Sequence, residues 1–194
     1  MKCKDIIAKI EEKYPVSFAE AWDNPGFLAG DASWEVKKLF LALDATDEVI
    51  DAAIQCGADM IITHHPLIFS GMKQVTADDF IGRRIIKLIQ HKICYYAMHT
   101  NFDVLGMAEL SADYLQLSQR EVLDVTYEEE TRKEGIGRCG KLSVPMTLKE
   151  CGKFVKEQLH LPFVQIYGDE NKIIEKVAVC TGSGKSLMKQ VLKN

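Results

Sequence analysis

The 194-residue sequence lacks the signals that mark several large classes of protein. No apolar run approaches the roughly 20 residues of a membrane-spanning helix, and the N-terminus has no apolar core of a secretory signal. The six cysteines include no Cys-x-x-Cys pair, which is typical of reduced core thiols. A net charge of −4 and no stripe of Lys or Arg interleaved with aromatic residues argue against a nucleic-acid partner. We therefore expect a soluble, cytoplasmic protein that does not contact membranes.

Short apolar runs alternate with amphipathic segments in the first part of the chain. Strands are expected at residues 39–43, 60–63 and 93–98, helices at 2–14, 47–56, 78–91 and 106–117, and a turn-rich loop at 22–31. Strands separated by helices pair in parallel through right-handed crossovers. This order predicts an α/β fold with a mainly parallel sheet that helices bury on both faces.

The residue pattern of the sequence changes from about Val122. A charged connector, best interpreted as a solvated loop, is expected at residues 128–135. Strands are expected at 136–144, 163–167 and 177–180, and helices at 147–158 and 185–193. We interpret this part as a smaller α+β unit. The predicted domains are residues 1–127 and residues 128–194.

The run Thr181-Gly182-Ser183-Gly184-Lys185-Ser186 resembles a phosphate-binding loop but lacks its first glycine. The nucleotide-binding spacing requires glycine where the chain has Val179. Without that glycine the backbone amides cannot wrap a β-phosphate. The run is better interpreted as a strand-to-helix turn that could still offer amides to an anion.

Side chains that bind metals follow each of the three expected strands of the first domain. Asp44 follows the first strand, His64 and His65 follow the second, and His99 and Asp103 follow the third. The carboxyl ends of parallel strands meet at one edge of a sheet, where ligands bind. Mixed imidazole and carboxylate donors suit zinc, iron or manganese better than magnesium or calcium. The sequence therefore predicts a metal site at this edge.

The His64-His65-Pro66 run fits the end of a strand. Neighbouring residues of a regular strand point to opposite faces, so both rings can share a cavity only where the strand has ended. Pro66 removes a backbone donor and holds His65 extended, which favours such an end. The alternative is a pair of surface or capping histidines, one of which is hydrogen-bonded to a carbonyl group.

Four motifs, in order, resemble the Nif-three-like dinuclear-metal proteins, which are often labelled "GTP cyclohydrolase 1 type 2 homolog". The motifs are Trp22-Asp23-Asn24-x-Gly26, Leu43-Asp44-Ala45-Thr46, Thr63-His64-His65-Pro66-Leu67 and His99-Thr100-Asn101-Phe102-Asp103. The resemblance continues through Gly135-Ile136-Gly137-Arg138 and the Gly182-Ser183-Gly184 turn to about Lys193. It implies a two-domain α/β fold that assembles into a ring-shaped homohexamer.

The resemblance also implies two divalent ions per complete subunit. By the family pattern His64, His65 and Asp103 are metal ligands, whereas His99 lies beside the centre as a candidate proton-transfer or supporting group. Asp44 is a weaker candidate of that kind. The family's remaining His and Glu ligands come from a later segment, and no residue after Gly184 supplies them. We therefore expect incomplete metal occupancy from these 194 residues.

A metal-dependent hydrolase is the leading functional hypothesis, since paired metals can activate water and polarise a phosphoryl or amide bond. The substrate would be a small molecule, such as one that contains phosphate. The cyclohydrolase label rests on resemblance alone. The alternative is a non-catalytic metal-binding scaffold or regulatory protein that acts through a partner.

Overall fold

The computed structural model describes residues 1–192, apart from the side chain of Ser186, and divides into two compact units. These units are Met1–Phe102 and Asp103–Asn194. The boundary lies earlier in the chain than the predicted division after residue 127. The helix expected at 106–117 therefore belongs with the strands that follow it.

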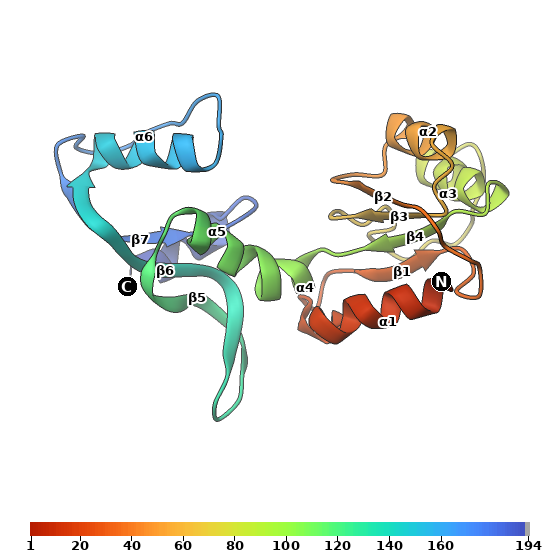
Figure 1. Ribbon diagram of the computed structural model, residues 1–194, viewed down its shortest axis with the longest axis horizontal. Helices are drawn as coiled ribbons and strands as arrows, with labels where there is room; N and C mark the ends of the chain where they lie inside the picture. Colours follow the sequence, from red (N-terminus) through yellow and green to blue (C-terminus); the bar gives the residue numbers. More distant parts are fainter. Residues whose placement is uncertain (193–194) are drawn as a thin grey trace. The chain divides into compact units, whose positions relative to one another are not determined.

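The first unit contains a four-stranded sheet in the order β1-β4-β3-β2 (Figure 1). Strands β2 (Leu39–Ala42), β3 (Met60–Thr63) and β4 (Cys94–Ala97) are parallel, as predicted. Strand β1 (Gly26–Ala29) runs antiparallel to β4. The expectation of a continuous loop at 22–31 is therefore wrong. Four residues embedded among turn formers carry no detectable periodicity, and pairing with β4 makes them a strand.

Helices cover the two faces of this sheet (Figure 1). On one face α1 (Cys3–Lys13) packs against alternate strand residues, among them Met60 and Tyr96. On the other face α2 (Asp47–Gln55) and α3 (Phe80–Gln90) pack against residues such as Ile61 and Tyr95. This split follows from the two-residue period of a strand. The mixed α/β architecture predicted from the sequence is thus confirmed.

Helices α2 and α3 both begin at side-chain caps. The Thr46 hydroxyl accepts a hydrogen bond from Val49 N at 3.2 Å at the start of α2, and the Asp79 carboxylate accepts one from Gly82 N at 2.9 Å at the start of α3. Gly57 follows α2 with a φ of 69°. These residues set where the helices start and stop, and thereby place the loops at the ends of the strands.

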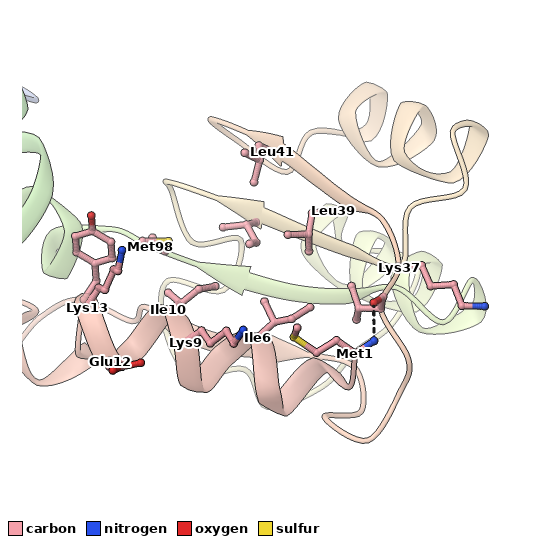
Figure 2. A pocket seen from close by; sticks show the side chains of 13 residues that line it. Met1, Ile6, Lys9, Ile10, Glu12, Lys13, Lys37, Leu39, Leu41 and Met98 are labelled. Carbon is pink, nitrogen blue, oxygen red and sulfur yellow. Dashed lines mark hydrogen bonds between the residues drawn. The ribbon is translucent and has the colours of Figure 1, made fainter.

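The sheet is not buried on both faces along β2, where the prediction is wrong. Leu39 and Leu41 lie on the α1 side and are 45% and 71% exposed. With Ile6 and Ile10 of α1 they line an open apolar groove of about 750 Å³ (Figure 2). Strand β2 is the edge of the sheet, and in the described residues nothing covers this groove.

The second unit is built on an antiparallel sheet in the order β5-β6-β7. Its strands are β5 (Ser118–Glu128), β6 (Lys133–Thr147) and β7 (Ile173–Val179). The charged stretch expected as a solvated loop is the exposed turn of the β5–β6 hairpin at 129–132, with strand residues on both sides of it. The strand expected at 163–167 is absent from the described residues, whereas α6 (Leu148–Gln158) matches its prediction.

Helical backbone begins immediately after His99, six residues before the predicted helix. It runs through α4 (Thr100–Phe102), a π-helical segment η2 (Asp103–Met107) and α5 (Ala108–Tyr114). At the other end of the unit, the turn after β7 contains Gly182 and Gly184 at positive φ. It leads to a short 3-10 turn η3 (Lys185–Leu187) and to α7 (Met188–Val191). The rest of the helix expected at 185–193 lies outside the described residues.

None of the helices in residues 1–192 is both long enough and apolar enough to cross a bilayer.

Candidate metal centre

Three histidines of the first unit converge at the carboxyl ends of β3 and β4. One ring nitrogen from each of His64, His65 and His99 lies within 4.8 Å of the others. The ring centroids are 5.1 Å apart for His64 and His65, 5.1 Å for His64 and His99, and 5.6 Å for His65 and His99. The expected convergence of the histidine pair with the next strand end is thus present in the structure.

The backbone around the pair is held by groups from the neighbouring strands. His65 N donates to the Leu43 carbonyl at 3.0 Å, which ties the loop to the end of β2. The buried Tyr95 hydroxyl donates to the His65 carbonyl at 3.0 Å and accepts from Leu67 N at 2.8 Å. Burial raises the pKa of Tyr95, so its hydroxyl keeps the proton that it donates. Strand β3 ends at Thr63, so His64 and His65 both lie beyond the strand and their rings can turn to one side.

The Nδ1 atom of each histidine lies 2.8 Å from an oxygen. The partner is the Met98 carbonyl for His64, Asp44 Oδ1 for His65 and Asp23 Oδ1 for His99. A carbonyl or a carboxylate accepts, so Nδ1 donates the proton, and in a neutral ring with this tautomer Nε2 carries the lone pair. Oxygen acceptors behind metal-binding histidines fix the tautomer and raise the basicity of the ring in this way.

Asp23 is the supporting group that sequence reasoning missed. Its side chain is fully buried, and besides His99 it accepts hydrogen bonds from Thr100 N at 3.0 Å and Thr100 Oγ1 at 2.5 Å. Burial by itself raises the pKa of this carboxyl group, but the hydrogen bonds from His99, Thr100 and Asn24 outweigh it and lower the pKa below its ordinary value. Asp23 was visible only as part of the Trp22-Asp23-Asn24 motif. No spacing rule links it to a histidine 76 residues later.

The donor set fits a divalent transition metal. Three imidazole ligands would leave a coordination position open for water or substrate, as catalytic zinc sites do. The His65 side chain is 48% exposed and that of His99 15% exposed, so the cluster is open to solvent. His99 groups with the pair as a third candidate ligand, a more direct role than the supporting one predicted for it.

The other two predicted site residues have different places. Asp44 Oδ1 lies 2.8 Å from His65 Nδ1, and its supporting role at a metal site stays a prediction. Asp103 belongs to the second unit, where its Oδ1 accepts a hydrogen bond from Thr181 Oγ1 at 3.1 Å. Its assignment as a metal ligand stays a prediction. The apolar groove of Figure 2 is lined by none of the three histidines.

Comparison with known proteins gives one consistent match. The model of the Duf34/NIF3 (NGG1p interacting factor 3) family matches residues 1–194. A Clostridium perfringens protein named "GTP cyclohydrolase 1 type 2 homolog" is 37% identical over 187 residues, which cover 95% of this chain and 71% of that protein. A Clostridium acetobutylicum protein of the same name is 36% identical over 195 residues, covering 100% of this chain and 72% of that protein.

A solved structure agrees with these matches. The crystal structure of a Bacillus cereus protein related to NIF3 superposes with a TM-score of 0.90 at 25% identity. The match covers 100% of this chain and 80% of that one. The family resemblance of the sequence motifs and the predicted fold are therefore confirmed.

Proposed function

Because the chain belongs to the Duf34/NIF3 (NGG1p interacting factor 3) family, we propose that it is a metal-dependent hydrolase whose histidine cluster holds a divalent ion. The single observation that supports this most is the set of three convergent imidazoles, His64, His65 and His99, each with an oxygen acceptor on Nδ1. Zinc, iron and manganese are the ions that such donors suit. The second ion and the ligand Asp103, which the family resemblance implies, are part of the same proposal.

The residues of the chain would prepare the site before any substrate arrives. Asp23, Asp44 and the Met98 carbonyl orient the three rings, so that the Nε2 lone pairs need no rearrangement. A bound divalent ion would lower the pKa of a coordinated water and polarise a phosphoryl or carbonyl oxygen. The exposed edge of His65 leaves that position accessible from solvent.

The substrate class comes from the relatives rather than from the histidines. Relatives carry the name "GTP cyclohydrolase 1 type 2 homolog", so a purine nucleotide is the first substrate to test. A non-catalytic scaffold is the competing function, and it would bind metal through the same residues without turnover. Cytoplasmic location and a homohexameric assembly complete the proposal.

The test combines metal content with a hydrolysis screen. The purified protein is loaded with Zn²⁺, Mn²⁺ or Fe²⁺, and bound metal is measured together with hydrolysis of GTP and of phosphodiester substrates. We expect the protein to bind metal. The His65→Ala or His99→Ala substitution should weaken this binding at least tenfold, whereas His91→Ala and His160→Ala should leave it unchanged. Turnover that disappears with the metal supports the hydrolase.

Two results would count against this proposal in different ways. Metal binding without turnover on any of these substrates would favour the scaffold. Equal metal binding by the wild type and by a His64→Ala, His65→Ala, His99→Ala triple variant would rule out the proposed metal centre itself.

A further inference from the structure

Two exposed aromatic side chains border the histidine cluster. Trp22 is 58% exposed and Phe69 is 50% exposed. Their ring centroids are 5.8 Å apart with an interplanar angle of 37°. Trp22 also lies edge-on to His99, at a centroid distance of 6.0 Å and an angle of 78°. We call this pair of rings the aromatic platform.

The loops that carry the platform are tied together and to the site. Asn24 Nδ2 donates to the Ile68 carbonyl at 2.6 Å, which links the Trp22 loop to the Phe69 loop. Before Trp22 in the chain, Glu20 N donates to Thr100 Oγ1 at 2.9 Å. Asp23, next to Trp22, is buried and bonded to His99. The Trp22 loop is therefore bonded to the Phe69 loop through Asn24 and to His99 through Asp23.

We propose that the aromatic platform binds a planar aromatic ring, of the nucleobase class, by stacking beside the histidines. This inference rests on the proposed function and adds the group that the site recognises. The two rings touch each other, so they form a continuous wall and not a slot that a ring could enter. A flat heterocycle is the ligand that can cover such a wall fully, because each aromatic face offers broad contact to another. The substituents of that ring would then lie beside His99.

The platform itself is uncharged, and the carboxylate of Asp23, next to Trp22 in the chain, already accepts from His99. It would therefore recognise the ring and not the phosphate of a nucleotide. Ring and phosphate recognition are thus separable by experiment. A sugar phosphate without a base should bind the wild-type protein no more tightly than it binds a variant that lacks the platform.

Tryptophan fluorescence gives a direct measurement, since Trp22 and Trp34 are the two tryptophans of the chain. In a Trp34→Phe background the emission reports on Trp22 alone. The metal-free protein is titrated with adenosine monophosphate, guanosine monophosphate and ribose 5-phosphate. We expect saturable quenching by both nucleotides and none by ribose 5-phosphate.

Variants assign the binding to the platform. By calorimetry, Trp22→Ala and Phe69→Ala should each weaken nucleotide binding about tenfold, the order expected for the loss of one stacking partner. Trp22→Phe should retain most of the affinity, and Phe80→Ala, an exposed aromatic elsewhere in the same unit, should have no effect. Zn²⁺ binding should be unchanged in the Phe69→Ala variant, and unfolding curves confirm that each variant is folded.

Several results would overturn the inference. The first is a nucleotide affinity that is unchanged in the Trp22→Ala, Phe69→Ala double variant, and the second is ribose 5-phosphate binding as tight as that of the nucleotides. The third is quenching that depends on protein concentration alone, which would make the platform a contact between copies of the chain. If nucleotides bind the platform but the histidines hold no metal, the proposed function fails and the inference stands. If metal binds and nucleotides do not, the inference fails alone.

Discussion

The three histidines differ in how firmly their supporting groups are held. The Asp23 side chain is fully buried and accepts from His99 and Thr100, whereas the Asp44 side chain is 50% exposed. A buried acceptor has no water to replace a lost partner, while an exposed one does. Asp23 should therefore matter more than Asp44 both to the stability of the fold and to the site.

We predict that Asp23→Asn weakens Zn²⁺ binding by roughly 10- to 100-fold, because groups that orient a metal-binding histidine have effects of this size. It should also lower the free energy of unfolding by about 1–3 kcal/mol, since the amide cannot accept every hydrogen bond that the carboxylate accepts. Asp44→Asn should have a smaller effect on both quantities.

A competition titration with a chromophoric chelator and urea unfolding measure the two effects. Asp51→Asn, which breaks a surface ion pair with Lys87, is the control for charge. Zn²⁺ affinities that agree between Asp23→Asn and Asp51→Asn would contradict the role given to Asp23.

A second residue-scale prediction concerns Glu109 and the buried Arg138. Arg138 is 3% exposed and pairs with Glu109 and Glu134, while its Nη1 donates to the carbonyls of Gly135 and Gly137. Burial raises the pKa of Glu109, but hydrogen bonds from Arg138 and Arg120 outweigh it, and the pKa lies below its ordinary value. The charged form is therefore favoured in the folded state.

A lowered folded pKa gives stability that is present above the unfolded pKa of about 4.3 and is lost as the pH falls through the folded value. Glu109→Gln should therefore be less stable than the wild type at pH 6, with a difference that shrinks as the pH falls below 4.3. The side chain is 46% exposed, so we expect no more than about 1 kcal/mol.

Urea unfolding at several pH values measures this difference. The matched control is Glu130→Gln, which removes the same charge in the exposed β5–β6 turn. A Glu109→Gln difference that is constant from pH 3 to pH 6 would show that the pair does not titrate with folding.

At the scale of elements, apolar runs bounded by turn formers were enough to place β2, β3 and β4. Their pairing in parallel then brought His64 and His99 to one edge, which is why that part of the site could be predicted. Strand β5 could not be found in this way. Its residues are mostly exposed and show no continuous apolar run, and it exists because β6 pairs with it along most of its length.

The supporting groups escaped prediction for a related reason. Asp23 contacts His99 only because β1 lies beside β4 and delivers the preceding loop to the site. That neighbour relation is tertiary and leaves no period in the sequence. The same holds for Trp22 and Phe69, whose contact joins two loops.

The β5–β6 hairpin provides an element-scale prediction at Gly135. A Cβ atom there would lie 1.9 Å from the Asp124 carbonyl oxygen, a backbone atom that cannot move without breaking the ladder. Gly135→Ala should therefore destabilise the second unit by about 1–3 kcal/mol, the usual range for forced overpacking. Amide hydrogen exchange of β5 and β6 should accelerate.

Gly71→Ala is the matched control, since a Cβ there meets nothing within 4 Å. Protection of the β5 and β6 amides that is equal in the Gly135→Ala and Gly71→Ala variants would contradict the close approach.

At the scale of the whole molecule, we expect a multimer in solution, a dimer or a hexamer. The exposed leucines of β2 beside the groove of Figure 2 form an apolar surface of the kind that drives association. Leu41→Lys places a charge there without touching the core, so it should reduce the average mass without lowering the melting temperature. Multi-angle light scattering checks this, with the exposed Leu110→Lys as control. A wild-type monomer would contradict the expected assembly.

Anomalous X-ray scattering can locate the single metal ion that we propose His64, His65 and His99 hold together. A crystal of the protein soaked in Zn²⁺ is measured on both sides of the zinc absorption edge. We predict an anomalous peak bonded to the Nε2 atoms of the three histidines, which is absent from the His99→Ala variant under the same soak. Zinc peaks found only elsewhere on the chain, with none at these three rings, would contradict the account.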